Sequence, residues 1–495
     1  MDRIPSVNRR NFLVVGSLAT AVTALQLTGG LATIPNRAQA DTLPAPSDIQ
    51  FDTGAFCAPP QTLQGIVMAM PPVHTIFLTA KLLRRPTRLD QTELNRVLTA
   101  LETAYPWGAA GLITFVSYGL PYFQRLNQSV VTANLPRLST DPNRFVLEEA
   151  TPAGSDVFAG SRNSKLRFNV SVAIENNDIL FMLRSDNANN LADAVSFLSG
   201  QNSLAGSAVV APRFSGLLSF TSSRAMFVQQ GLPRSIADQD SLPYARTMNP
   251  DSPMWMGFFD QHTNGAGPPP ICTFAGNSSA HLTSAVAGDY FDNGSIQHLS
   301  HNIIDMLQWF DMFSDTAPPG ADGTYDERVQ YMFHAPPINQ GDQEDLFTDG
   351  GGPAILQNEN RGPLYAEQTA QGIGIGVGND DDPTEPRVGH LSALQRSSRA
   401  ADGTPIHMRM DGPGYDDMDV PDGSVQPKLQ FTIFVPTSDF FSTMRANQAA
   451  ADLMHKYNMA QEDNGLERFI TATRRQNYLI PPRRHRAFPL VEIGG

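Results

Sequence analysis

The stretch LQFTIFVP at residues 429–436 is the clearest strand signal in the chain, and DFFSTMRANQAAADLMHKY follows it at 439–457 with helical spacing. Ser438 or Asp439 is suited to cap that helix. A strand followed by a helix also recurs in the first half of the sequence. We therefore expect an α+β fold, in which helices pack on one side of antiparallel sheets.

The first half predicts strands at 63–70 (LQGIVMAM), at 111–119 (GLITFVSYG) and at 178–186 (DILFMLRSD). Between the first two, residues 89–105 place four large apolar side chains on one helical face. The segment NNLADAVSFLSG at 189–200 predicts a second helix. This alternation starts again after about residue 245.

The second cycle opens with IQHLSHNIIDMLQWFDMF at 296–313, for which we predict a helix with Leu299, Ile303 and Phe310 on its apolar face. His298 and His301 would then share one face, a spacing that suits a metal. No glutamate or cysteine ligand follows nearby. We therefore interpret these two side chains as helix-packing or solvent-facing histidines.

Composition limits the classes of partner. The 495 residues are 41% hydrophobic and 17% charged, which is enough for one large core or two ordinary ones. The formal net charge of −14 repels phosphate backbones and anionic lipid headgroups. Nucleic acid is therefore excluded as the expected partner.

The first forty residues resemble an export signal. Arg9 and Arg10 precede an apolar segment, and Ala38-Gln39-Ala40 supplies small residues for cleavage after Ala40. The paired arginines predict the twin-arginine export machinery, which carries folded proteins. Cleavage would leave a mature chain of net charge −17, without a stable membrane anchor, in the periplasm or outside the cell.

The chain has two cysteines, Cys57 and Cys272. Two thiols cannot build a disulfide framework or a four-thiolate zinc site. A single bridge between them stays open at this point.

Three short segments of the second half carry residues suited to redox chemistry. Asp260 ends the apolar run MWMGFFDQ, where burial would raise the pKa of its carboxyl and suit a proton shuttle, although a turn or helix cap would explain it too. His390 in RVGHL could hold a haem iron or be structural. Arg409 in IHMRMDGPGYDD could stabilise the charge that develops when a peroxide bond breaks.

In combination these segments resemble the dye-decolourising peroxidase family. The family's GxxDG motif is matched in part by Gly257 and Asp260, its proximal histidine by His390, and its distal arginine by Arg409 before a Pro/Gly turn. The order of the three residues and the 19-residue step from His390 to Arg409 agree with that family. Gln261 stands where the motif has its last glycine, so the role of Asp260 remains open.

The resemblance implies two ferredoxin-like domains of the dimeric α+β barrel-like superfamily, over residues 41–245 and 246–495, with haem b in the second. It further implies that His390 is the axial iron ligand, Asp260 the proton shuttle and Arg409 the group that stabilises peroxide charge and contacts haem. Asp411 would be a further polar group on the haem side. The implied activity is oxidation of an organic dye or phenol by hydrogen peroxide.

Two alternatives remain from the sequence. The chain could bind haem or handle its iron without rapid turnover, or it could keep the fold and lack the cofactor. His407 would line the same pocket or lie at the surface. Trp107, Trp255 and Trp309 would pack in the core or relay oxidising equivalents. The sequence contains no G-x-S-x-G motif, which would indicate a serine nucleophile. The reducing substrate and the oligomeric state are not determined by the sequence.

Overall fold

The computed structural model of the chain describes residues 44–57, 61–63, 66–68, 70–148, 165–248, 252–256, 269–277, 282–311, 406–449 and 466–494, with the single residues 157 and 250. The predicted export signal, Asp260 and His390 lie outside these residues. The domain boundary predicted at residue 245 stays a prediction.

The elements of the first half follow the order β3 (His74–Leu82), α2 (Arg88–Ala104), β4 (Ile113–Gly119), β6 (Ile179–Ser185), α5 (Ala188–Leu198) and β9 (Leu218–Phe227). In the sheet the strands stand in the order β4, β6, β3, β9, and all neighbours are antiparallel. This strand order and chain order define a ferredoxin-like βαββαβ unit.

The second half contains β10 (Ser295–Ile304), β11 (Met408–Arg409), β12 (Gly412–Asp416), β13 (Gln426–Val435), α13 (Asp439–Ala449) and β14 (Ile470–Ile480). Both β11 and β12 pair with β13, and β13, β10 and β14 follow in that order. The described strands therefore repeat the ferredoxin-like order. The predicted α+β fold of two such units is confirmed.

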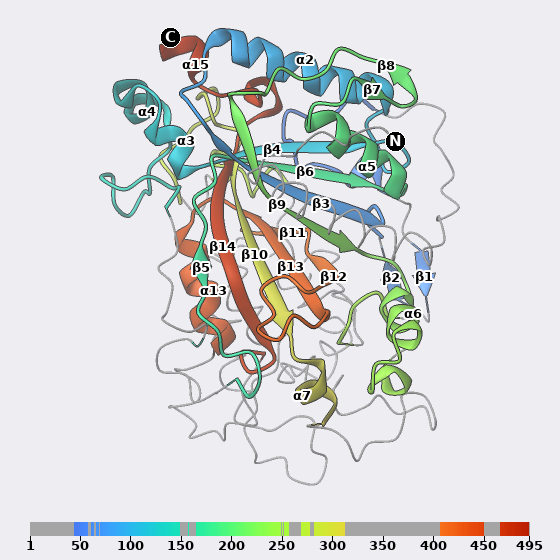
Figure 1. The fold of residues 1–495 in the computed structure, drawn as a ribbon. Coiled ribbons are helices and arrows are strands. Elements are labelled where there is room, and N and C mark those ends of the chain that lie inside the picture. The colour runs from blue at the N-terminus through green and yellow to red at the C-terminus, as the bar shows by residue number, and fades with distance from the viewer. Residues whose placement is uncertain are drawn as a thin grey trace.

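Strand β14 also pairs with two strands of the first half, β4 and β5 (Ala173–Ile174), and these pairings join both units into one ten-stranded sheet (Figure 1). The smaller elements are η1 (Gly54–Phe56), β1 (Gln61–Leu63), β2 (Ile66–Met68), α3 (Leu120–Gln124), α4 (Gln128–Asn134), β7 (Ser203–Leu204), β8 (Ser207–Ala208), α6 (Leu232–Gln239), η2 (Ala245–Thr247), α7 (Met306–Asp311), η5 (Arg483–His485) and α15 (Val491–Gly494).

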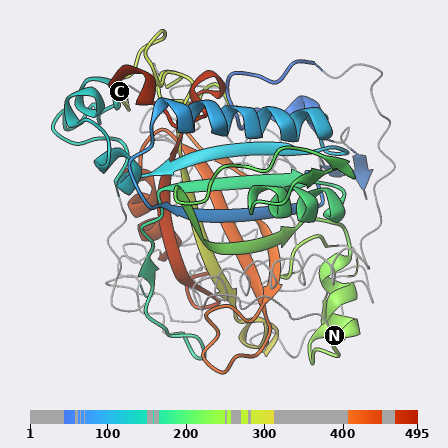
Figure 2. The ribbon, with the colours of Figure 1, turned by 45° about the horizontal axis from the view of Figure 1, so that its top comes forward.

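Helices cover the outer face of the first unit, as predicted. Thr87 and Asp90 form a capping box at the start of α2, and Leu94, Val97 and Leu98 are fully buried beneath it. Helix α5 packs on the same face, and Figure 2 shows both helices with the strands of the first unit. The helices predicted at 89–105 and 189–200 are confirmed.

Two predicted elements were wrong. The single strand predicted at 63–70 is replaced by the short pair β1 and β2, and the long strand β3 begins only at His74. The helix predicted at 296–313 is strand β10 followed by the one-turn helix α7. Every residue of β10 is buried, so its apolar residues need not alternate with polar ones. Their spacing therefore resembled that of an amphipathic helix.

The ten-stranded sheet curls until its two edges meet. A Cβ atom at Gly414 would lie 3.0 Å from the carbonyl oxygen of Ala225, and one at Gly412 would overlap Met226 and Val228. The missing side chains therefore let β12 approach β9 closely. The enclosed side of the sheet holds an apolar core in which Phe77, Phe115 and Met182 of the first unit meet Leu299, Phe434 and Tyr478 of the second.

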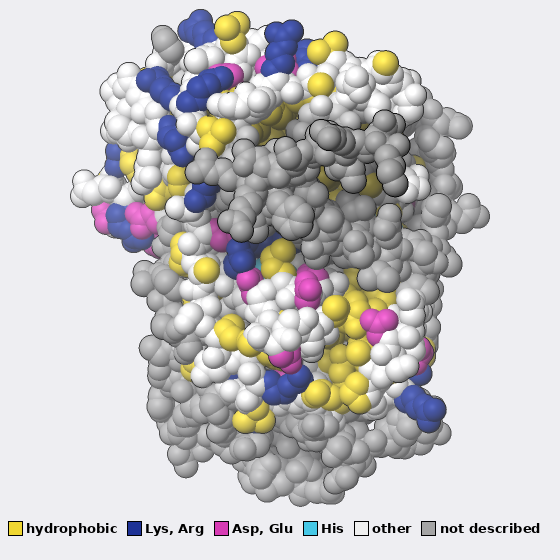
Figure 3. Space-filling model, viewed as in Figure 1, with side chains coloured by type: hydrophobic (Ala, Val, Ile, Leu, Met, Phe, Trp, Pro, Cys, Tyr) yellow, Lys and Arg dark blue, Asp and Glu magenta, His cyan; other side chains and the backbone are white. Residues whose placement is uncertain are grey.

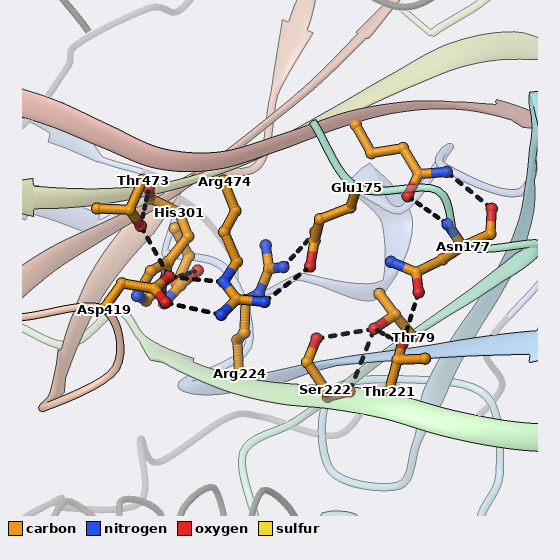
Figure 4. Close-up of polar contacts among 12 residues, drawn as sticks. Thr79, Glu175, Asn177, Thr221, Ser222, Arg224, His301, Asp419, Thr473 and Arg474 are labelled. Carbon is orange, nitrogen blue, oxygen red and sulfur yellow. Dashed lines mark hydrogen bonds and ion pairs between the residues drawn. The ribbon is translucent and has the colours of Figure 1, made fainter. Parts of the chain in front are cut away.

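One end of this enclosed space is charged instead of apolar. Glu175, which directly follows β5, pairs with Arg224 of β9 and Arg474 of β14 (Figure 4). Arg474 also holds Asp419 through two hydrogen bonds of 2.6 and 2.7 Å. Burial alone would raise the pKa of Asp419, but Arg474 lowers that pKa to about 2. These ion pairs connect the two units across the inside of the sheet.

Arginines also tie α2 to the C-terminal end of the chain. Arg84 binds Asp90 of α2 with two hydrogen bonds, while Arg85 and Arg88 donate to the carbonyl groups of Gly494 and Glu492. Basic side chains accordingly gather at the top of the molecule in Figure 3. Among the described residues, no helix combines the length and apolar character needed to span a membrane.

Replacing Gly119 should destabilise the junction of the two units. Gly119 faces Tyr478 across that junction, and a Cβ atom there would overlap the carbonyl oxygen of Asn177 and the amide of Gln476. We expect Gly119→Ala to lower the free energy of unfolding in urea by about 2 to 3 kcal/mol. Gly54→Ala is the control, because no heavy atom lies within 4 Å of its added carbon. Equal losses in both variants would contradict this account.

Candidate functional site

The outer face of the second unit forms one wall of a pocket, and α13 forms the other. The space between these walls, together with the solvent at its open mouth, measures about 1180 Å³. Its apolar lining residues are Met254, Trp255, Met256, Ile304, Pro413, Leu429, Phe431, Ile433, Phe440, Phe441, Met444, Leu466, Ile470 and Ala472. The polar ones are Ser300, Asn302, His407, Arg409, Asp411, Lys428, Arg445, Gln448 and Arg475.

Strand alternation explains which side chains reach the pocket. On β10, Ser300 and Asn302 line it, whereas Leu299 points to the enclosed core on the other side of the sheet. Ser300 stands opposite Phe431 of β13 and Arg475 of β14 in the strand register. The wall is therefore built by three neighbouring strands whose order brings distant parts of the sequence together.

Arg409 and Asp411 both line this pocket. Arg409 lies on the edge strand β11 opposite Ile433, and Asp411 follows two residues later, before β12. Burial lowers the pKa of the Arg409 guanidinium, and the nearby Asp411 carboxylate opposes that shift. Burial raises the pKa of Asp411 and Arg409 opposes it. The two groups therefore act on each other inside a largely apolar site.

Two further guanidinium groups reach the pocket from other elements. Arg445 of α13 donates a 3.0 Å hydrogen bond to the fully buried carboxylate of Glu467. The Arg475 guanidinium carbon lies 5.0 Å from the centre of the Phe441 ring, and burial lowers its pKa to about 10. Arg475 therefore remains a cation at neutral pH. Neither arginine was predicted to reach the site, because nothing in its local sequence distinguishes it from a structural arginine.

Aromatic side chains complete the wall near β12. Trp255 is 1% exposed, and its Nε1 donates to the carbonyl oxygen of Gly414 over 2.9 Å. Tyr415 lies against it at 5.5 Å between ring centres. Trp107 and Trp309 are buried as well: Trp309 packs in the same apolar cluster as Trp255, and Trp107 packs in the enclosed core. Of the three tryptophans, Trp255 reaches the pocket.

The other predicted residues divide into three groups. His407 lines the pocket, which was one of the two positions predicted for it. Asp260 and His390 lie outside the described residues, so their predicted roles remain predictions. Cys57 and Cys272 are free thiols, so no bridge joins them.

The prediction of a shared helical face for His298 and His301 was wrong. Both lie on β10, where residues three apart point to opposite sides of the sheet, and both are buried. His301 faces Asp416 and Gln430 on the enclosed side. In the part of the chain that the structure describes, no cluster of histidine, cysteine or carboxylate side chains is arranged to hold a metal ion.

A family model described as a family of unknown function, DUF7405, matches residues 72–482. The chain belongs to this family. No curated protein matches it.

Among solved structures, this family member is similar to a DyP-type peroxidase from Cellulomonas bogoriensis at 15% identity and a TM-score of 0.45, covering 86% of this chain and 93% of that one. A dye-decolorizing peroxidase from Bacteroides thetaiotaomicron is 12% identical with a TM-score of 0.44, covering 86% and 96%. The encapsulated DyP-type peroxidase from Mycobacterium smegmatis is 14% identical with a TM-score of 0.43, covering 87% and 98%.

Lowering the pH from 7 to 5 should destabilise the fold through buried histidines. Burial lowers the pKa of His74 and of His298 to about 4, whereas an unfolded histidine titrates near 6.5. The unfolded chain therefore takes up protons first, and each histidine contributes a loss of about 2 kcal/mol over this range. His74→Gln should reduce the difference between urea unfolding at pH 7 and at pH 5 by about that amount. Any packing defect of the His74→Gln variant is present at both pH values and therefore cancels in this comparison. The prediction would be contradicted if the variant and the parent lost the same stability between pH 7 and pH 5.

Proposed function

We propose that the chain is an exported haem peroxidase that uses hydrogen peroxide to oxidise organic substrates such as dyes or phenols. The observation that carries the proposal is the joint placement of Arg409 and Asp411 in an apolar pocket on the outer face of the second unit. These are the two described residues that the resemblance to dye-decolourising peroxidases assigns to the haem side. The cofactor would be haem b.

The described wall fits such a group chemically. A haem presents a flat apolar ring with two carboxylates at one edge, and the pocket combines aromatic and methionine side chains with the cations Arg409, Arg445 and Arg475. Buried cations attract carboxylates strongly because little water screens them. When bound, haem would supply the redox chemistry with peroxide.

The residues of the chain would bind, orient and move protons. His390 would hold the iron, as the resemblance implies. Asp260 would move a proton between the two peroxide oxygens, and Arg409 would stabilise negative charge on the departing oxygen. Asp411 would hold Arg409 in place, because the two groups attract each other within the pocket.

An absorption spectrum of the protein purified with adequate haem supply tests the proposal directly. We expect a Soret band at one haem per chain and peroxide-dependent oxidation of a phenol. Haem binding without turnover would favour the alternative of a haem-handling or iron-handling protein. The absence of any haem binding would favour the cofactor-free alternative.

Substitutions should separate the roles. His390→Ala should abolish stoichiometric haem binding or change the iron spectrum. Arg409→Leu should still bind haem. It should react with peroxide roughly 10²-fold more slowly, because the transition state loses about 3 kcal/mol of stabilisation. Asp260→Asn should slow it by about 10²- to 10⁴-fold. Stopped-flow mixing with peroxide measures both rates, and a parental rate for Asp260→Asn would remove that residue from the mechanism.

Export by the twin-arginine route is part of the proposal. Recognition of the paired guanidinium groups depends on their shape as well as their charge. Arg9→Lys combined with Arg10→Lys should therefore retain the unprocessed protein inside the cell. Fractionation followed by N-terminal sequencing measures this. Protein cleaved after Ala40 and found outside the cytoplasm would contradict the route.

A further inference from the structure

A chain of three polar side chains leads from the pocket into the sheet. Ser300 lines the pocket, and its Oγ lies 2.5 Å from Nε2 of His298 on the same strand. Nδ1 of His298 lies 2.7 Å from Oδ1 of Asn477 on β14. The amide nitrogen of Asn477 in turn donates to the carbonyl oxygen of Glu148. The imidazole is therefore held at both nitrogens.

The hydrogen bonds also determine where the protons sit. Because the Asn477 nitrogen donates to a carbonyl, its Oδ1 faces the histidine and can only accept. Nδ1 of His298 must then carry the proton, so the lone pair of a neutral ring lies on Nε2. Ser300 donates its hydroxyl proton to that lone pair. The oxygen of Ser300 keeps its own lone pairs for a group in the pocket.

The surroundings keep this ring neutral. His298 is fully buried and stacks on Phe441 at 4.0 Å between ring centres. Burial lowers its pKa to about 4, the bond to Asn477 opposes that shift, and the charge of Arg445 adds to it. The charged groups packed near the ring among the described residues include Arg445 of α13, Arg475 of β14 and Glu467, which pairs with Arg445. At neutral pH the ring can therefore accept a proton.

We propose that His298 is the proton acceptor for a protic ligand in this pocket and that Ser300 relays the proton. The Ser300 oxygen takes a proton from the ligand while its own hydroxyl proton passes to Nε2 of His298. One proton leaves the ligand, one reaches the imidazole, and no electrons move. Asn477 holds the resulting imidazolium, which returns the proton by the same route.

The inference rests on the proposed function, in which the protic ligand is hydrogen peroxide. It adds a base on β10 to the carboxylate predicted at Asp260. A matched control lies on the enclosed side of the same sheet. There Ser117 is equally buried, and its hydroxyl is 2.5 Å from Oε1 of Gln297, an amide that does not titrate.

Cyanide binding tests the relay without turnover. Hydrogen cyanide must lose its proton when the anion binds a haem iron, so a base in the pocket accelerates association. In stopped-flow experiments on the haem-loaded full chain, we expect Ser300→Ala and His298→Gln to slow association by about 10²-fold. Ser300→Thr should restore most of the rate because it keeps the hydroxyl. Ser117→Ala should match the parent.

A pH profile distinguishes proton transfer from simple packing. Asn477→Asp places a carboxylate beside Nδ1, which favours the imidazolium, so the acidic limb of the rate profile should move to higher pH by at least about one unit. A profile that does not move, or unchanged rates in Ser300→Ala and His298→Gln, would overturn the relay while leaving haem binding intact. A chain that takes up no haem in any variant would overturn the proposed function and the relay with it.

Nuclear magnetic resonance on the haem-free chain supplies an independent readout. With ¹⁵N-labelled histidine, the signals that disappear in His298→Gln should show a neutral ring protonated at Nδ1 from pH 7 to about 5. Protonation at Nε2 instead would reverse the donor order and overturn the relay. Circular dichroism of each variant confirms that the fold is kept.

Discussion

The pairing of β10 with β13 on one side and β14 on the other is the constraint on which the rest of the structure depends. This strand is buried on both faces, so its side chains alternate between the enclosed core and the outer face that carries the pocket. A shift of register by one residue would exchange the two sets. Ser300 would then face the core, and Leu299 would face the pocket.

The enclosed side shows how two units behave as one molecule. The sheet continues through a junction of only two residue pairs between β14 and β4, which by itself is a weak connection. Phe77 and Met182 of the first unit share a core with Phe434 of the second, and Glu175 pairs with arginines from both units. Breaking such buried pairs by removing one partner leaves an uncompensated charge, so the cluster in Figure 4 favours one arrangement of the units.

The pocket side has the opposite character. Its walls are mostly apolar, but three guanidinium groups reach it from β11, α13 and β14. Low local polarity strengthens every interaction that these groups make with an anion. The same burial lowers the pKa of His298, so its Nε2 lone pair is unprotonated at neutral pH. Burial among packed aromatic side chains therefore affects both the strength with which the guanidinium groups bind anions and the protonation state of His298.

The sequence by itself determined the fold class, helices α2 and α5 and strand β13. These features depend on local periodicity or on residues close together in the chain, which a pattern can report. The helix predicted from the sequence at β10 was wrong because burial on both faces removes the alternation of apolar and polar residues that identifies a strand. Only the tertiary structure brought Ser300, His298 and Asn477 into one hydrogen-bonded chain, since Asn477 lies 179 residues from His298 and meets it through strand register alone.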